Sequence, residues 1–136
     1  MMLRRAATSF LFFFMTFAYG SGQDAGTIPA NVISAFRNGD AKALSAFFNT
    51  KIELVILDRE NVYSKTQAEL IMKSFFEKNK PSGFRVIHKG GRSDAQYAIG
   101  LYSSSGKTFR VYMLIKTVDK TPRIHQLRIE KENGQS

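Results

Sequence analysis

The second half of the chain alternates between apolar and polar residues with a period of two, from Phe84 to Ile129. Successive side chains of a β-strand point to opposite faces, so this pattern predicts strands with one buried face. Four such stretches follow one another with short connections, which is typical of antiparallel strands in a meander. They are centred on Val86, Ile99, Val111 and Leu127.

The segment Ser104-Ser105-Gly106 predicts a three-residue hairpin loop with Gly106 in the left-handed conformation. This loop sets Leu101 opposite Phe109 and Tyr97 opposite Met113. One face of the meander, predicted to be the concave one, then carries a mostly apolar set of side chains: Phe84, Val86, His88, Tyr97, Ile99, Leu101, Phe109, Val111, Met113, Ile115, His125, Leu127 and Ile129.

The first half predicts two helices and a hairpin. Pro29 suits the first turn of a helix that Asn38 and Gly39 end, and Asp40 then caps a second helix. The buried stripe of the second helix is predicted to be Leu44, Phe47 and Phe48. Next come a strand at 52–57, turn residues at 58–61 and a second strand at Val62 and Tyr63.

A third helix is predicted from a capping box formed by Thr66 and Glu69. It should end by Lys80, because Pro81 cannot continue a helix. Its inward residues are predicted to be Leu70, Ile71, Phe75 and Phe76. The predicted fold class is therefore α+β, a four-strand meander plus an N-terminal hairpin packed on three helices, in the order ααββαββββ.

The N-terminus predicts an export signal. Arg4 and Arg5 precede an apolar run from Ala6 to Tyr19, and small residues follow. A membrane anchor is the alternative, but the run is shorter than the roughly 20 apolar residues that a spanning helix needs. The predicted organisation is a signal peptide at 1–22, a linker at 23–27, one domain at 28–132 and a disordered tail at 133–136. The protein is expected to be exported, periplasmic or secreted, with no stable membrane span after cleavage.

Charge and composition limit the partners. The chain has no cysteine, which excludes lipid attachment at cysteine, disulfides and thiolate metal sites. Twenty basic residues face eleven acidic ones, and cleavage would reduce the net charge from +9 to +7 by removing Arg4 and Arg5. Such a charge favours either an anionic partner or a merely solvated basic surface. Because export separates the protein from nucleic acid, no nucleic-acid partner is predicted, which leaves an acidic glycan or a lipid surface.

The order of elements resembles the nuclear transport factor 2-like superfamily, which is also cystatin-like and SnoaL-like. Within it, the chain is similar to a family of short secreted Bacteroidetes proteins of unknown function. The residues that carry this resemblance are Ile28-Pro29-Ala30, Asn38-Gly39-Asp40 and the ending 126–131, Gln-Leu-Arg-Ile-Glu-Lys. The resemblance implies a curled sheet that forms a cone with a possible ligand pocket. It does not imply an activity.

The resemblance also implies where a catalytic base would stand. Isomerases of the superfamily place a carboxylate on the first strand, and here the apolar Ile56 takes that position, with Glu53 and Asp58 nearest. An enzyme that uses His88 with Tyr97 or Asp58, of the hydrolase, isomerase or dehydratase type, stays an alternative. With two histidines far apart in sequence, no metal or other cofactor is predicted.

The leading prediction is a non-catalytic module that binds a small apolar ligand, a partner chain or both. Its pocket candidates are Tyr63, His88, Tyr97, Met113 and His125. The outer face of the sheet is the predicted interface, with Arg and Tyr residues of the kind that are enriched in interfaces. The resemblance implies homodimerisation through this face, and the interface candidates are Arg85, Ile87, Tyr102, Arg110, Tyr112 and Leu114.

Overall fold

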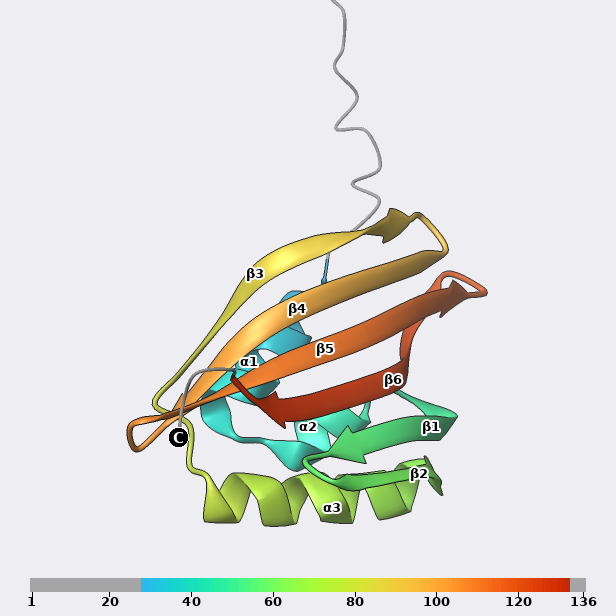
Figure 1. Cartoon of the computed structure of the whole chain (residues 1–136). Helices are drawn as coiled ribbons and strands as arrows, with labels where there is room; N and C mark the ends of the chain where they lie inside the picture. The colour runs from blue at the N-terminus through green and yellow to red at the C-terminus, as the bar shows by residue number, and fades with distance from the viewer. Residues whose placement is uncertain (1–27, 133–136) are drawn as a thin grey trace, which may run out of the picture.

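The computed structural model describes residues 28–132 as a curved sheet over a layer of helices (Figure 1). The predicted signal peptide, linker and tail lie outside these residues. The predicted order ααββαββββ is confirmed. The elements are α1 Ala30–Asn38, α2 Ala41–Ser45, β1 Phe48–Ile56, β2 Arg59–Ser64, α3 Lys65–Lys78, β3 Gly83–Arg92, β4 Ala95–Ser104, β5 Lys107–Val118 and β6 Thr121–Lys131.

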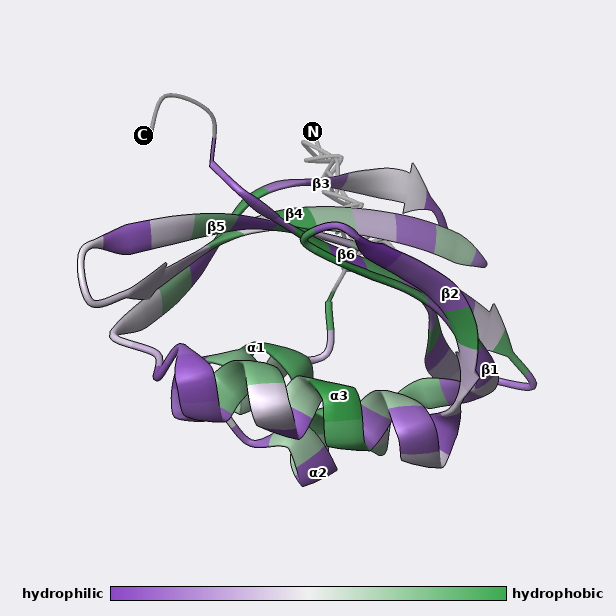
Figure 2. Cartoon of the chain, turned by 60° about the horizontal axis from the view of Figure 1, so that its bottom comes forward, coloured by the Kyte–Doolittle hydropathy of each residue, from purple (hydrophilic) through white to green (hydrophobic). Residues whose placement is uncertain are grey.

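The strands form one sheet in the order β2-β1-β6-β5-β4-β3. The meander from β3 to β6 is antiparallel, as predicted, and β1 joins it by pairing parallel with β6. The N-terminal hairpin therefore extends the sheet beside its last strand. Figure 2 shows the sheet arching over the helices, with α3 running beneath the arch.

The ends of the helices follow from local side chains. Gly39 ends α1 in the left-handed conformation at φ 62°, and Asp40 caps α2 by accepting the Ala43 N–H at 3.0 Å. The predicted capping box of α3 was wrong by two residues, since Ser64 and Gln67 form it. The chain passes from β2 into the helix at Ser64, while Glu69 accepts a hydrogen bond from the buried Ser45 hydroxyl.

The end of α2 and the buried stripe of α3 also differ from the prediction. α2 ends at Ser45, and Phe48 already belongs to β1, where it pairs with Ile124 of β6. On α3, Leu70 is 60% exposed, and the buried stripe is Ala68, Met72, Phe75 and Phe76. Both differences arise because the neighbouring β6 and the arch of the sheet, rather than local periodicity, decide which side is covered.

The predicted register of the β4–β5 hairpin was wrong by one residue. The loop has two residues, Ser105 and Gly106, with φ values of 45° and 76°, and Tyr102 pairs with Phe109. A shift of one residue turns every side chain of a strand to its other face. Tyr97, Ile99 and Leu101 therefore lie on the outer face, and Tyr102 points into the core with no exposed surface.

Two β-bulges change which face the histidines occupy. In β3, Val86 pairs with Gly100 but His88 pairs with Ile99, so Ile87 is the inserted residue. His88 is thereby turned from the predicted concave face to the outer one, where it is exposed. In β6 the inserted residue is His125, between the pairs Leu114–Gln126 and Ile115–Ile124.

The core fills one end of the arch with aromatic rings. Phe36 of α1 stacks on Phe84 of β3 with ring centroids 4.6 Å apart, and Phe75 of α3 meets Phe109 at 5.3 Å. Gly100 permits this packing, since a Cβ there would lie 2.5 Å from the Phe84 ring. The space beneath β3, β4 and β5 is thus occupied by side chains.

Within residues 28–132, no helix has the length and apolar character needed to cross a membrane.

Candidate ligand cleft between α3 and the first hairpin

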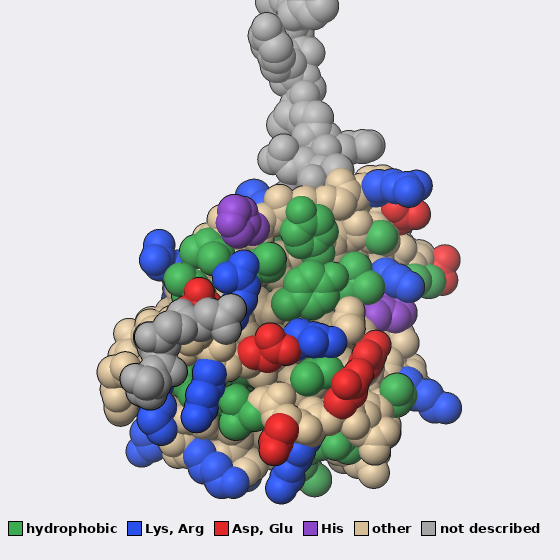
Figure 3. Space-filling model, viewed as in Figure 1, with side chains coloured by type: hydrophobic (Ala, Val, Ile, Leu, Met, Phe, Trp, Pro, Cys, Tyr) green, Lys and Arg blue, Asp and Glu red, His purple; other side chains and the backbone are tan. Residues whose placement is uncertain are grey.

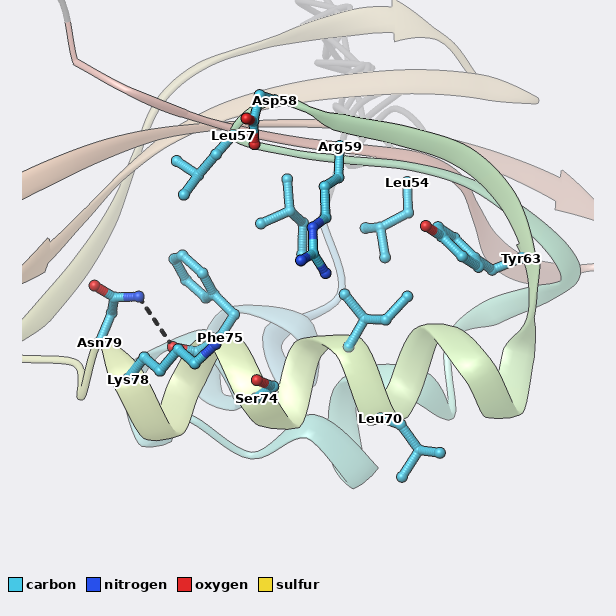
Figure 4. Close-up of a pocket in the computed structure, with 12 residues that line it drawn as sticks. Leu54, Leu57, Asp58, Arg59, Tyr63, Leu70, Ser74, Phe75, Lys78 and Asn79 are labelled. Carbon is cyan, nitrogen blue, oxygen red and sulfur yellow. Dashed lines mark hydrogen bonds between the residues drawn. The ribbon is translucent and has the colours of Figure 1, made fainter.

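A cleft of about 470 Å³ opens between α3 and the β1–β2 hairpin, at the other side of the arch (Figure 4). Small-molecule pockets typically measure about 300–1,000 Å³. The residues that line it come from β1, the turn, β2 and α3: Leu54, Ile56, Leu57, Asp58, Arg59, Tyr63, Leu70, Ile71, Ser74, Phe75, Lys78 and Asn79.

The walls of the cleft are apolar because of two periodicities. Leu54 and Ile56 alternate toward the helix side of β1 and are buried. Ile71 and Phe75 are four residues apart and share one side of α3. Phe75 also contacts Tyr102 and Phe109, so its ring divides the cleft from the filled core.

Half of the residues that line the cleft are polar, and two of these, Arg59 and Lys78, are cations. Arg59, the first residue of β2, extends from the hairpin toward α3, and Lys78 belongs to the last turn of α3 (Figure 4). Within residues 28–132 neither side chain forms a hydrogen bond or an ion pair. The Asn79 amide donates to the Phe75 carbonyl at 3.2 Å and is thus already engaged.

The one carboxylate among the residues that line the cleft is Asp58. It stands in the exposed turn after β1, next to Leu57, whose φ is 56°. Ile56, at the position implied for a base, is a buried wall of the cleft, and Glu53 alternates to the outer face. Among residues 28–132, the strands and the helix that form the walls thus contribute no acidic group to the cleft, and only the turn does.

Of the predicted pocket residues, only Tyr63 lines this cleft. Met113 is fully buried in the core, and Tyr97 lies on the outer face with its ring over Gly90. His88 is exposed on that face and borders a separate hollow of about 250 Å³ beside Ile28 and Ile33. The predicted shared concave placement of His88 and Tyr97 was thus wrong, because the hairpin register and the β3 bulge both turn them outward.

His125 also lies outside the cleft. It is half-buried at the β6 bulge, and its Nε2 is enclosed without a hydrogen-bond partner among the described residues. Burial, followed by the nearby positive charge of Lys116, lowers the pKa of His125 below its usual value of about 6.5. These two effects favour a neutral imidazole. This environment fits a structural role for the His125 side chain at the bulge.

The sequence reasoning missed Arg59, Phe75 and Lys78 as residues of the cleft. Arg59 was assigned to a turn, although the structure starts β2 there. Phe75 was predicted to point inward, which is correct, but its place beside a cavity depends on how far α3 stands from the hairpin. No local pattern reports that spacing. The one signal in the sequence was the position of Arg59 shortly after the predicted end of the first strand.

The outer face of the sheet carries a mixed surface, which we call the outer patch: Arg85, Tyr97, Ile99, Leu101, Arg110, Tyr112, Leu114 and Arg128. Apolar side chains gather in the middle of this face, with basic and acidic groups among and around them (Figure 3). Tyr97 and Tyr112 stack with centroids 6.4 Å apart. Among the predicted interface residues, Arg85, Arg110, Tyr112 and Leu114 lie here. Tyr102 does not, because of the register shift, and Ile87 is the half-buried bulge residue.

Ion pairs reduce the positive charge of the outer patch. Arg110 lies 3.5 Å from Glu132, and Arg128 lies 3.1 Å from Glu130. Exposed pairs of this kind contribute about 0–1 kcal/mol to stability. Their larger effect is on the electrostatic potential of the outer patch, because two of its three arginines have an acidic neighbour. No group of three or more His, Asp or Glu side chains in residues 28–132 is arranged to hold a metal ion.

The curved sheet over three helices defines the class of protein: an NTF2-like, or cystatin-like, fold. An NTF2-like protein from Silicibacter pomeroyi matches with a TM-score of 0.58 at 13% identity, over 76% of this chain and 88% of that one. A cystatin-like domain from Nostoc punctiforme matches with a TM-score of 0.60 at 11% identity, over 76% and 72%. At these identities the likeness concerns the fold alone.

The chain belongs to the DUF4783 family, a domain of unknown function whose model matches residues 29–130. A family member from Bacteroides ovatus is 40% identical over 78% of this chain and 96% of that one, with a TM-score of 0.74. Another, from Bacteroides fragilis, is 33% identical over 78% and 100%, also with a TM-score of 0.74. The predicted resemblance is confirmed. Comparison with curated proteins found no match.

Proposed function

We propose that the protein is a non-catalytic binding module that holds a small, mainly apolar molecule in the cleft between α3 and the β1–β2 hairpin. The observation that carries this proposal is the cleft itself, about 470 Å³ with walls from Leu54, Ile56, Ile71 and Phe75. An apolar ligand would gain about 25 cal/mol for each Å² of apolar surface removed from water.

The placement of the titratable groups supports binding rather than catalysis. His88 and Tyr97 lie on the outer face, whereas Asp58 lies at the mouth of the cleft. A general base needs to be within hydrogen-bond reach of the proton that it abstracts. The sheet separates the groups that the enzyme alternative would combine.

The uncharged dye Nile red, whose emission rises in apolar surroundings, tests this proposal. The native protein should bind it saturably, and Ile71→Trp, which fills the cleft, should lower the affinity at least about tenfold. Val62→Trp is the matched control, because Val62 is 58% exposed on β2 and does not line the cleft. Equal binding by both variants, or no saturable binding by the native protein, would contradict the proposal.

A second candidate function is self-association through the outer patch. It is favoured by Tyr97, which is 40% exposed although it stacks on Tyr112, and by the half-buried Ile99, Leu101 and Leu114 around it. Contiguous apolar surface of this kind commonly marks interaction sites. Export, either to the periplasm or to the medium, is proposed from the N-terminal sequence alone.

A further inference from the structure

We propose that the ligand of the cleft is an apolar molecule that ends in a single carboxylate, and that Arg59 binds the carboxylate. This inference rests on the proposed function of the cleft and adds the chemical class of its ligand. It starts from an arginine that extends into the space between α3 and the hairpin without a partner among residues 28–132 (Figure 4).

The surroundings of Arg59 differ from those of Arg110 and Arg128 on the same sheet. Arg110 and Arg128 each have a glutamate within 3.5 Å. The exposed side chain of Arg59 instead extends from the hairpin toward α3, beside Leu54 (Figure 4), and Ile71 of α3 also lines this cleft. A guanidinium is planar and offers two parallel N–H donors, a geometry that fits both oxygens of a carboxylate.

The charges that line the cleft favour one negative charge on the ligand. Arg59 and Lys78 are positive and Asp58 is negative, so the residues that line the cleft carry one net positive charge. A monoanion balances this charge, whereas a phosphate monoester near its dianionic form would exceed it. The other polar lining residues, Tyr63, Ser74 and Asn79, are uncharged, and the Asn79 amide already donates to the Phe75 carbonyl.

The geometry also gives the carboxylate and the hydrocarbon part of the ligand different places in the cleft. Arg59 directly follows the β1–β2 turn, whereas Phe75 forms the side of the cleft that faces the core. A ligand with its carboxylate on Arg59 would thus lay its hydrocarbon part along Leu54, Ile56 and Ile71. Lys78, in the last turn of α3, adds a second positive charge from the opposite wall.

The test compares decanoate with decanol, which share the hydrocarbon chain and differ in charge, in displacement of Nile red. The native protein should prefer decanoate by about fivefold or more, as a partly exposed charge-assisted pair would give. Arg59→Gln should abolish this preference, so that the variant binds decanoate no more tightly than decanol. Arg92→Gln removes the same charge from β3, outside the cleft, and should retain the preference.

A variant that removes a negative charge from the cleft, instead of a positive one, strengthens the test. Asp58→Asn removes the negative charge at the mouth and should raise the affinity for decanoate but not for decanol. Added salt should reduce the decanoate preference, because it screens exposed charges.

The outcomes separate the two proposals. If neither compound displaces the dye from the native protein, the cleft is not the binding site and the proposed function fails. If both bind equally, or if Arg59→Gln keeps the preference, the cleft binds apolar molecules but the carboxylate inference is wrong. Tighter binding of decyl phosphate than of decanoate would overturn the assignment to a monoanion.

Discussion

The hydroxyl of Tyr102 in β4 donates a hydrogen bond to the backbone carbonyl of Asn79, the residue that follows α3. The carbonyl of this C-cap residue has no partner within the helix, and the bond satisfies it. Tyr102 has no exposed surface, and burial raises its pKa to about 12. One side chain thereby fastens the C-terminal end of α3, beside Lys78 and Asn79 of the cleft, to β4.

Tyr102→Phe should lower the free energy of unfolding by about 1–2 kcal/mol, because it leaves the Asn79 carbonyl without its donor. Urea unfolding followed by circular dichroism measures this change. Tyr112→Phe is the matched control, since Tyr112 lies half-buried on the outer patch, and it should change stability by less than about 0.5 kcal/mol. Similar effects of both variants would show that the Tyr102 bond does not stabilise the fold.

The same tyrosine predicts a loss of stability at alkaline pH. Its pKa is about 12 in the folded protein against about 10 in the unfolded chain, so the folded state favours the neutral phenol. This contribution is complete below pH ~10 and is lost as the pH rises toward ~12, on the order of 2 kcal/mol in total. Thermal melts from pH 9 upward should fall more steeply for the native protein than for Tyr102→Phe. Parallel curves would contradict the assignment.

Two of the three hairpin turns of the meander offer opposite changes in stability. Gly106 has φ 76°, and a Cβ there would meet nothing within 4 Å, so Gly106→Ala should cost about 1 kcal/mol through backbone conformation alone. Lys120 has φ 63° in the β5–β6 turn, and Lys120→Gly should stabilise the protein by a similar amount. Chemical denaturation of both variants checks the pair, and changes of the same sign would argue against a backbone origin.

Self-association is expected to depend on the outer patch. Tyr97→Asp places a charge in the middle of the patch and should convert a dimer to monomer in sedimentation equilibrium. Val118→Asp is the control, because Val118 is 55% exposed near the end of β5, away from the stacked tyrosines. A monomeric native protein at all concentrations, or a dimer that survives Tyr97→Asp, would remove this candidate function.

The sequence predicted the order of the elements because each is specified locally. The period-two pattern of the meander, the Asp40 cap and the left-handed Gly39 depend on a few neighbouring residues. Register is a different matter. β4 has apolar or aromatic residues on both faces, Ile99 and Leu101 outside and Ala98 and Tyr102 inside, so alternation alone could not choose between them.

The candidate site was harder to predict than the fold. One positive φ at Ser105 decides the loop length, and with it the face of Tyr97 and Tyr102. The bulge at Ile87 then decides the face of His88. The cleft arises from the separation of α3 and the hairpin, which depends on long-range packing. Tyr63 was therefore the one pocket candidate that the structure places there.

The parallel pairing of β1 with β6 has a consequence for how the protein acquires its structure. Within residues 28–132, β1 is the first strand, and it has six paired residues in β2 and five in β6, the last strand. During synthesis from the N-terminus, the edge of β1 that pairs with β6 stays unpaired until β6 emerges. A chaperone that shields this edge would be most useful in that interval.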